Sequence, residues 1–377
     1  MAHRLRNRTF FHVRGLAIKA NPSWLILVGL VVYVIAENFI PSVIPEASWL
    51  LRWALALLGA AGLFASLLIH ELSHSLVARQ CGLPVAGITL FVFGGVSELE
   101  DEPPSAQAEF LMAAAGPLAS IIIGGTLIPL WAIAMALHAP LPLQAVLQYL
   151  WMINIFLAAF NLLPAFPMDG GRILRSLLWG ASRDQRAATR TAALVGALFG
   201  LLLSAFGAWR LMRGEFSGLF PMLVGLFLFR AARASMGMAN VRARLSGMTV
   251  AQFMSAPPLL VPHGMNLATF VRDFVIPYRL GRFPVVDERG VLVGAVRSDA
   301  LRNVPVATWS ASPVSAVMDP LNAADALDPD ASAVELLGAL RRRDRVPVIV
   351  ARDGRPVGTV RVQTFLDYLS MARGRRR

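Results

Sequence analysis

The sequence predicts a polytopic α-helical membrane domain, with six transmembrane helices and a re-entrant β segment, followed by a smaller α/β domain. Of the 377 residues, 56% are hydrophobic and only 15% are charged, whereas a soluble domain carries about 25% charged residues. Residues 1–240 hold 27 charged side chains, and the shorter segment 241–377 holds 31. The second segment also contains an internal repeat. These observations place a membrane domain in residues 1–240 and a soluble domain in residues 248–372.

Six apolar stretches in residues 1–240 are long enough to span a membrane, which takes about 20 mostly apolar residues. Residues 110–168, for example, carry no charged side chain, and this length accommodates two spans. A single cysteine, Cys81, excludes an internal disulfide framework and a Cys-rich zinc module. The predicted spans lie near 22–39, 51–78, 107–137, 144–166, 188–210 and 217–232.

Basic side chains indicate the orientation of these spans. Five lie in the N-terminal tail before the first span, five follow the fourth span, and four follow the sixth. Cytoplasmic loops carry such an excess, so both termini are expected in the cytoplasm, although Arg210 and Arg213 are exceptions. The net charge of +12 therefore does not require a nucleic-acid partner. We interpret the basic C-terminal end, residues 373–377, as a tail near anionic membrane lipid.

The second span contains His70 and His74, with Glu71 between them. Positions four residues apart share one face of a helix, so the two imidazoles can bind one metal ion while Glu71 accepts a proton from the attacking water. A catalytic zinc site needs a third protein ligand and keeps one position for water. Ionisable residues inside a span usually serve function. The alternative is a pair of core histidines bonded to the backbone.

An extended segment follows the second span. Residues 88–96 are β-branched and aromatic with two glycines, which is typical of a hairpin, and the acidic flank at 98–102 fits a solvated loop. Extended backbone at membrane depth requires protein or a water-filled cavity around it. Phe91 and Phe93 therefore either pack within the protein or offer a strand edge to an unfolded peptide.

The third metal ligand is expected from the end of the fourth span. Asp169 is the only acidic residue between Glu109 and Asp184. Two prolines open the helix before it, and two glycines after it let the backbone approach closely. This setting favours a carboxylate directed at a metal. The alternative is a helix-end carboxylate paired with Arg172.

These motifs together resemble the site-2 protease family of intramembrane zinc metalloproteases. The resemblance rests on three patterns, which are His70-Glu71-x-x-His74, Ala115-Gly116-Pro117, and Asn161…Pro164…Pro167-x-Asp169-Gly170-Gly171.

The resemblance implies a role for each matched residue. His70, His74 and Asp169 would bind one Zn²⁺, although this ligand set also suits other divalent metals. Glu71 would be the general base, and Asn161 would hold the substrate peptide or the developing oxyanion. For Asn161 the alternative is an interhelical hydrogen bond. Segment 88–96 would be the re-entrant β element beside the cleft, with Phe91, Phe93, Gly94 and Gly95 as substrate-binding residues.

The soluble segment contains a repeat with an offset of 63 to 64 residues. Val250-x-x-Phe-Met254 recurs as Val314-x-x-Val-Met318, and Gly290…Gly294 recurs as Gly354…Gly358. This resembles a tandem pair of cystathionine-β-synthase (CBS) motifs, at 248–305 and 312–372, which often bind adenine nucleotides. Asp299 is the candidate ribose-binding residue, one position short of the usual spacing. A dimerisation or docking module without a ligand is the equal alternative.

We therefore expect a zinc-dependent metalloendopeptidase that cleaves a transmembrane helix of a membrane-tethered substrate and is modulated by its CBS pair. The resemblance implies a single-span substrate such as a pro-sigma or anti-sigma factor, a bacterial or archaeal cell membrane, and homo-oligomers formed through the CBS domains. Two alternatives remain. One is a CBS-regulated transporter or channel that uses His70, Glu71 and His74 for permeation, and the other is a proteolytically inactive homologue that only binds helices.

Overall fold

The computed structural model describes residues 8–13, 15–22, 24–91, 94–99, 103–255, 259–320, 326–342 and 347–374. The chain divides into two compact units, Met1–Ala239 and Asn240–Arg377. Each unit is described by itself.

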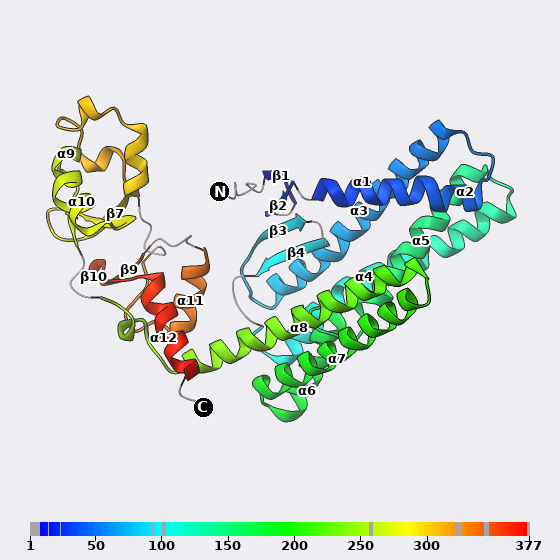
Figure 1. The fold of residues 1–377 in the computed structure, drawn as a ribbon. Helices are drawn as coiled ribbons and strands as arrows, with labels where there is room; N and C mark the ends of the chain where they lie inside the picture. Colours follow the sequence, from blue (N-terminus) through cyan, green and yellow to red (C-terminus); the bar gives the residue numbers. More distant parts are fainter. Residues whose placement is uncertain are drawn as a thin grey trace. The chain divides into compact units, whose positions relative to one another are not determined.

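Six helical segments of the described chain are long and apolar enough to cross a membrane, as the sequence predicts (Figure 1). Large apolar side chains on their outer faces, such as Leu25 and Leu50, are exposed, which suits contact with lipid. The first segment joins α1 (Trp24–Val34), the π-helical turn η1 (Ile35–Phe39) and α2 (Ile40–Val43). The other segments are α3 (Trp49–Gln80), α4 (Ala106–Ala136), α5 (Leu141–Asn161), α7 (Gln185–Met212) and α8 (Leu219–Leu245), the last preceded by the 3-10 turn η2 (Phe216–Gly218).

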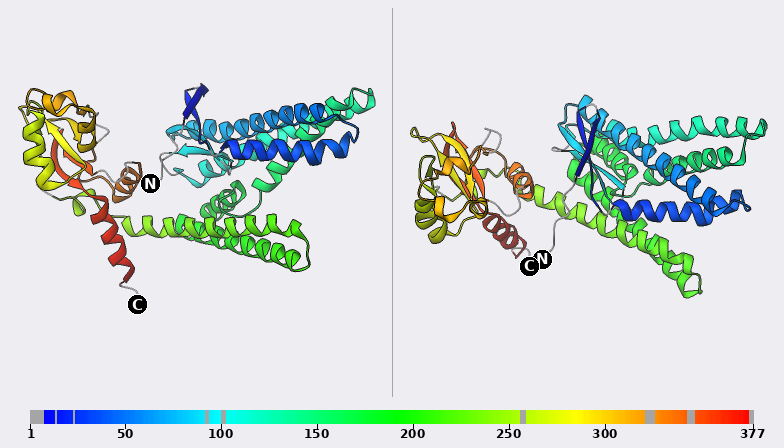
Figure 2. Two further views of the ribbon diagram at one scale, coloured as in Figure 1. Left: turned by 45° about the horizontal axis from the view of Figure 1, so that its top comes forward. Right: turned by 90° about the horizontal axis from the view of Figure 1, so that it is seen from above.

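A four-stranded sheet joins the N-terminal segment to the chain that follows α3. Its order is β1-β2-β3-β4, and β2 and β3 pair in parallel with Ile18 opposite Ile88. Both isoleucines are buried and pack against Leu68 and Leu72 of α3, beside which the sheet lies (Figure 2). The strands are β1 (Arg8–Val13), β2 (Leu16–Ala20), β3 (Val85–Phe91) and β4 (Gly94–Leu99).

Two features of this sheet bear on the sequence predictions. The hairpin expected in residues 88–96 is present as β3 and β4, and its re-entry into the membrane stays a prediction. The interpretation of the N-terminal segment as a tail is wrong for residues 8–13 and 16–20, which form β1 and β2. These strands are stabilised by parallel pairing with a segment about 70 residues away, so their local sequence gives little sign of them.

The fourth span ends at Asn161 rather than near residue 166. Pro164 and Pro167 explain this early end, because proline lacks an N–H and disfavours the helical conformation of the residue before it. The chain becomes helical again at α6 (Asp169–Ser182). A Cβ atom on Gly171 would lie 2.7 Å from the Ala165 carbonyl carbon, so glycine lets α6 begin tight against the preceding loop.

Helices α7 and α8 lie side by side along their lengths (Figures 1 and 2). A Cβ atom on Gly200 of α7 would lie 2.7 Å from the Gly225 carbonyl oxygen of α8. The two backbones therefore touch directly, which is how small residues bring membrane helices together.

The second unit contains two similar halves, as the repeat predicts. The first half has β5 (Val261–Pro262), a helix made of α9 (Leu267–Phe270), η4 (Val271–Val275) and α10 (Ile276–Tyr278), then β6 (Arg282–Val286) and β7 (Leu292–Arg297). The second half has α11 (Ala333–Arg342), β9 (Val348–Arg352), β10 (Arg355–Val360) and α12 (Val362–Gly374). Short elements are η3 (Val250–Gln252), η5 (Ser298–Asn303), η6 (Val306–Thr308), η7 (Val314–Ala316) and β8 (Asp319–Pro320).

The two halves of this unit exchange equivalent contacts. The segment that opens the second half pairs with β7 as β8, and its Met318 covers Gly294. In the same way Met254, at the opening of the first half, covers Gly358, and Ser255 pairs with Thr359 of β10. This reciprocal packing produces the α/β domain that the repeat predicts.

Candidate metal centre

Two helices bring three metal-binding side chains together inside the first unit. His70 and His74 lie on α3, and Asp169 is the first residue of α6. The two Nε2 atoms are 3.2 Å apart, and each lies 3.2 Å from Asp169 Oδ2. All three residues are buried. The structure therefore joins the three candidate ligands in one compact triangle, although they are separated by up to 99 residues in the sequence.

Helix α4 holds both imidazole rings through their Nδ1 atoms. His74 Nδ1 lies 2.6 Å from the Met112 carbonyl oxygen, and His70 Nδ1 lies 3.0 Å from Ser120 Oγ. A carbonyl oxygen only accepts hydrogen bonds, so the His74 Nδ1–H donates and the Nε2 atom of the neutral ring presents a lone pair. Such partners fix the tautomer and orientation of metal-binding histidines.

The donor set fits a divalent cation. The His74 Nε2 lone pair and the Asp169 carboxylate are both acceptors, so their 3.2 Å approach is repulsive unless a cation or proton lies between them. Two ligand atoms at zinc bond lengths in a tetrahedral site lie about 3.3 Å apart. The edges of the triangle match this spacing, and its three corners leave a fourth position open.

Gly116 leaves the space in front of the two Nε2 atoms empty. A Cβ atom at this position would lie 2.6 Å from His70 Nε2 and closer still to His74 Nε2. Any larger residue would therefore occupy the volume that a metal ion or a water molecule needs. The open space beside the two Nε2 atoms therefore also fits a metal ion at this centre.

Asp169 is held in its ionised form. Burial favours the neutral acid, but His70 and His74, when protonated, outweigh it and hold the pKa of Asp169 well below its ordinary value, as a bound cation would. The candidate partner Arg172 forms its recorded ion pair with Glu109, with Nε 4.0 Å from Oε1, and interacts with Asp169 only electrostatically. The carboxylate of Asp169 is thus directed at the imidazoles and available as an anionic ligand.

The other predicted site residues lie in different settings. Glu71 is half-buried on α3 and interacts electrostatically with His74, its neighbour one helical turn away. Asn161 ends α5, and its Nδ2 donates to the Leu157 carbonyl oxygen at 3.0 Å, within its own helix. Asp299 lies on η5 in the second unit, where Arg297 Nε donates to its carboxylate at 2.9 Å. This hydrogen bond holds the pKa of Asp299 below its ordinary value.

Three of the four predicted substrate-binding residues lie at the paired ends of β3 and β4. Phe91 ends β3 and pairs with Gly94, and Gly95 pairs with Leu90. Phe93 lies outside the described residues.

Sequence reasoning missed most residues on the buried face of α4 that carries the partners of the two histidines, although Gly116 entered it within the Ala115-Gly116-Pro117 pattern. Glu109, Met112, Gly116 and Ser120 recur every three or four residues, so they share one buried face of α4. The spacing of Glu109 and Ser120 from Gly116 could have indicated them. Met112 contributes a backbone carbonyl, which leaves no mark in a sequence.

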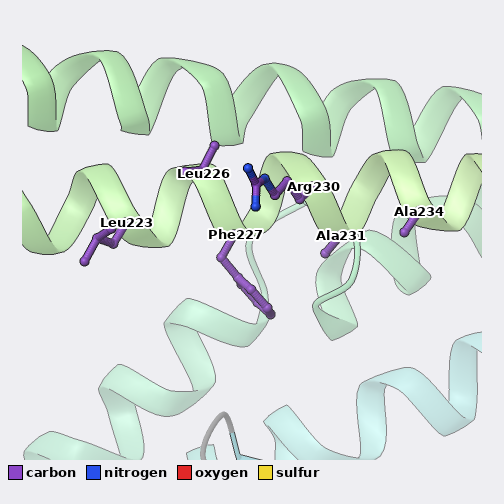
Figure 3. A pocket seen from close by; sticks show the side chains of 6 residues that line it. All are labelled: Leu223, Leu226, Phe227, Arg230, Ala231 and Ala234. Atoms are coloured by element: carbon purple, nitrogen blue, oxygen red, sulfur yellow. The ribbon is translucent and has the colours of Figure 1, made fainter.

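A pocket on α8 shares no lining residue with this centre, and Figure 3 shows its six lining residues. Its lining contains one cation, Arg230, and no acid or histidine, so it offers no metal-binding side chain. The lining residues are Leu223, Leu226, Phe227, Arg230, Ala231 and Ala234.

Comparison with known proteins agrees with the geometry. The sequence model of peptidase family M50 matches residues 58–139 and 129–204, and that of the CBS domain matches residues 250–306 and 314–371. A homologue named zinc metalloprotease sll0528, from Synechocystis sp., is 35% identical over 314 residues, which cover 81% of this chain and 79% of that protein. A homologue named zinc metalloprotease Rip3, from Mycobacterium tuberculosis, is 32% identical over 326 residues, which cover 86% of this chain and 83% of that protein.

A solved structure is also similar. The site-2 protease from Methanocaldococcus jannaschii is 28% identical, with a TM-score of 0.42, and the match covers 61% of this chain and 95% of that one. The matched family, the similarity over most of two relatives and the membrane-spanning helices lead to one conclusion. The chain is a multi-pass membrane protein of peptidase family M50, the site-2 protease family of intramembrane metalloendopeptidases, and it carries a tandem CBS domain.

Proposed function

We propose that the centre binds one Zn²⁺ through His70, His74 and Asp169 and hydrolyses a peptide bond in the transmembrane helix of another protein. The observation that carries this proposal is the triangle of three candidate ligand atoms 3.2 Å apart, with the space beside the two Nε2 atoms kept open by Gly116. When bound, zinc polarises the scissile carbonyl and lowers the pKa of water to about 7.

Glu71 moves the proton in this proposal. Its carboxylate accepts a proton from the attacking water and returns it to the leaving amine, which is the ordinary task of a general base that becomes a general acid. Its place on α3 between the two histidines in sequence, and its electrostatic interaction with His74, support this role. The rigid support of both rings by α4 keeps the reacting geometry fixed during the proton transfer.

The substrate is held by two further features. Among the described strands, β4 pairs with β3 only, so its other edge can accept an extended peptide by strand addition. A transmembrane helix must unwind locally to expose its carbonyls, and this edge would hold the unwound segment, with Phe91, Phe93, Gly94 and Gly95 as the substrate-binding residues. Asn161 would donate an amide hydrogen to the peptide or the developing oxyanion.

The proposed protease reaction also suggests the partners of the chain and its location. A single-span membrane protein, such as a pro-sigma or anti-sigma factor, fits a protease that acts on membrane-tethered regulators. Both termini would lie in the cytoplasm, because basic residues gather on that side. The membrane would be that of a bacterium or an archaeon, as the family resemblance implies. The CBS pair would also join two copies of the chain.

The CBS pair would regulate cleavage by binding an adenine nucleotide, with Asp299 near the ribose. Asp299 is half-exposed, so its carboxylate can exchange Arg297 for a ribose hydroxyl. Titration of the full chain with ATP or AMP measures this directly. We expect saturable binding, weakened at least tenfold by Asp299→Asn, and a changed cleavage rate. If neither binding nor any change in rate is found, regulation by nucleotide is rejected and the docking alternative is adopted.

The proposed reaction is tested with purified protein and a candidate single-span substrate in liposomes. Glu71→Gln should retain one zinc per chain and lose at least 10²-fold in cleavage rate. The matched control is Glu37→Gln in the first span, where the acid lies in η1, an element separate from the centre. An active Glu71→Gln protein would contradict the proposal. Ion flux that persists after zinc removal would instead favour the transporter.

A further inference from the structure

A buried carboxylate on α4 lies beside the proposed centre without belonging to it. Glu109 lies in the first turn of α4, and its side chain is fully buried. Its Oε1 accepts hydrogen bonds from Arg175 of α6, at 2.6 Å from Nε and also from Nη2. Its Oε2 has no hydrogen-bond partner among the described residues. Burying the charges of this pair costs desolvation free energy. The pair therefore calls for an explanation.

Arg175 connects three parts of the structure. It lies six residues after Asp169 on the same helix, about 9 Å along the axis. Its guanidinium also lies over the ring of Phe166, 5.3 Å from the centroid, in the loop that leads into Asp169. A single side chain therefore ties α4, α6 and the loop before the carboxylate ligand.

The same face of α4 also contacts the two histidines. Met112 and Ser120 of α4 hold His74 and His70, so this helix fixes the two imidazoles. Asp169 arrives on α6, and the ion pair of Glu109 with Arg175 joins α6 to α4. Ligand atoms must lie within about 0.2 Å of their proper distance from a metal, and a small rotation of α6 would exceed this tolerance.

We propose that Glu109 is a positioning residue for the metal centre, acting through Arg175 to orient α6 so that Asp169 reaches the two histidines. This inference rests on the proposed metal site. Arg172, with its Nε 4.0 Å from the same oxygen, adds charge to the pair. Partners of this kind commonly change metal affinity by 10- to 100-fold when they are removed.

The experiment measures Co²⁺ binding to the intact, metal-free protein in detergent, by visible absorption and by competition with a chelator. Glu109→Gln should weaken Co²⁺ binding 10- to 100-fold and alter the intensity of the visible bands, which report coordination geometry. The control is Glu215→Gln, which breaks the exposed ion pair with Arg210 in the same unit and should leave binding unchanged. Thermal unfolding of each metal-free variant is measured in parallel.

A double variant distinguishes positioning from general stability. If Glu109 acts through Arg175, the variant with Glu109→Gln and Arg175→Gln should bind Co²⁺ about as weakly as either single variant, because the two residues act as one unit. Effects that multiply would overturn the proposal. So would a Glu109→Gln protein that unfolds at a lower temperature but binds Co²⁺ with wild-type affinity and spectrum, since that is a structural role alone.

Two further cases are a Glu109→Gln protein that does not fold and a wild-type protein that binds no metal. If Glu109→Gln does not accumulate as folded protein, Glu109→Asp and Arg175→Lys are used, because they keep both charges and alter only the reach and shape of the pair. Weakened Co²⁺ binding in both supports the proposal, and wild-type binding in both overturns it. Wild-type protein that binds no Co²⁺ or Zn²⁺ would reject the metal site itself, a result separate from any effect of Glu109.

Discussion

Replacing Gly116 by alanine adds one methyl group in front of the proposed metal ligands. The new Cβ would lie 2.6 Å from His70 Nε2, whereas ordinary contacts between heavy atoms are about 3.5 Å. Helix or ring must therefore move by about 1 Å, several times the tolerance of about 0.2 Å for metal-ligand distances. We expect zinc affinity to fall by more than the roughly 100-fold that removal of a supporting residue causes.

The assay is zinc content per chain after purification, followed by competition with a chelator. Gly125→Ala is the matched control, because it makes the same substitution in the same helix at a position with no atom within 4 Å of the new Cβ. Both changes should favour the helix by up to about 1 kcal/mol, so lost zinc in Gly116→Ala alone cannot come from a weaker helix. Equal zinc affinity in the two variants would show that the space left by Gly116 is not needed for zinc binding.

Three further predictions concern separate parts of the chain. Ser120→Ala removes the partner of His70 Nδ1 and should weaken zinc binding about tenfold in the chelator assay. An unchanged zinc affinity would show that Ser120 does not support the centre. Asn161→Ala should lower kcat about 10²-fold with zinc content unchanged. An unchanged kcat would show that Asn161 only forms its hydrogen bond with the Leu157 carbonyl and does not act on the substrate. Phe270→Ala empties a fully buried position in the second unit and should destabilise it by about 3–5 kcal/mol in thermal unfolding, with zinc retained; a loss below 1 kcal/mol would contradict the packing.

The sequence was sufficient to predict the three candidate ligands because their signals are local or rare. His70 and His74 have helical spacing within one span, and Asp169 is an isolated acid in a long uncharged segment. The arrangement behind them could not be predicted in the same way. The acceptor for His74 is the Met112 carbonyl, which every residue type provides, and the partner of Glu109 lies 66 residues away on α6.

The strands show the same contrast. The β3–β4 hairpin has a local signal, because two β-rich stretches meet at adjacent glycines. The N-terminal strands β1 and β2 are held by parallel pairing of β2 with β3, a contact between segments on either side of a 32-residue helix. Pairing over such a distance is decided by tertiary packing, and local propensity is a weak guide to it.

Zinc K-edge X-ray absorption of the purified full-length protein tests the proposed centre most directly. One zinc per chain should be bound by two imidazole nitrogens and a carboxylate oxygen at about 2.0–2.2 Å, with no sulfur ligand, and Asp169→Asn should lower the zinc content. A protein without stoichiometric zinc, or one whose zinc environment is unchanged by Asp169→Asn, would show that α3 and α6 do not form a metal site.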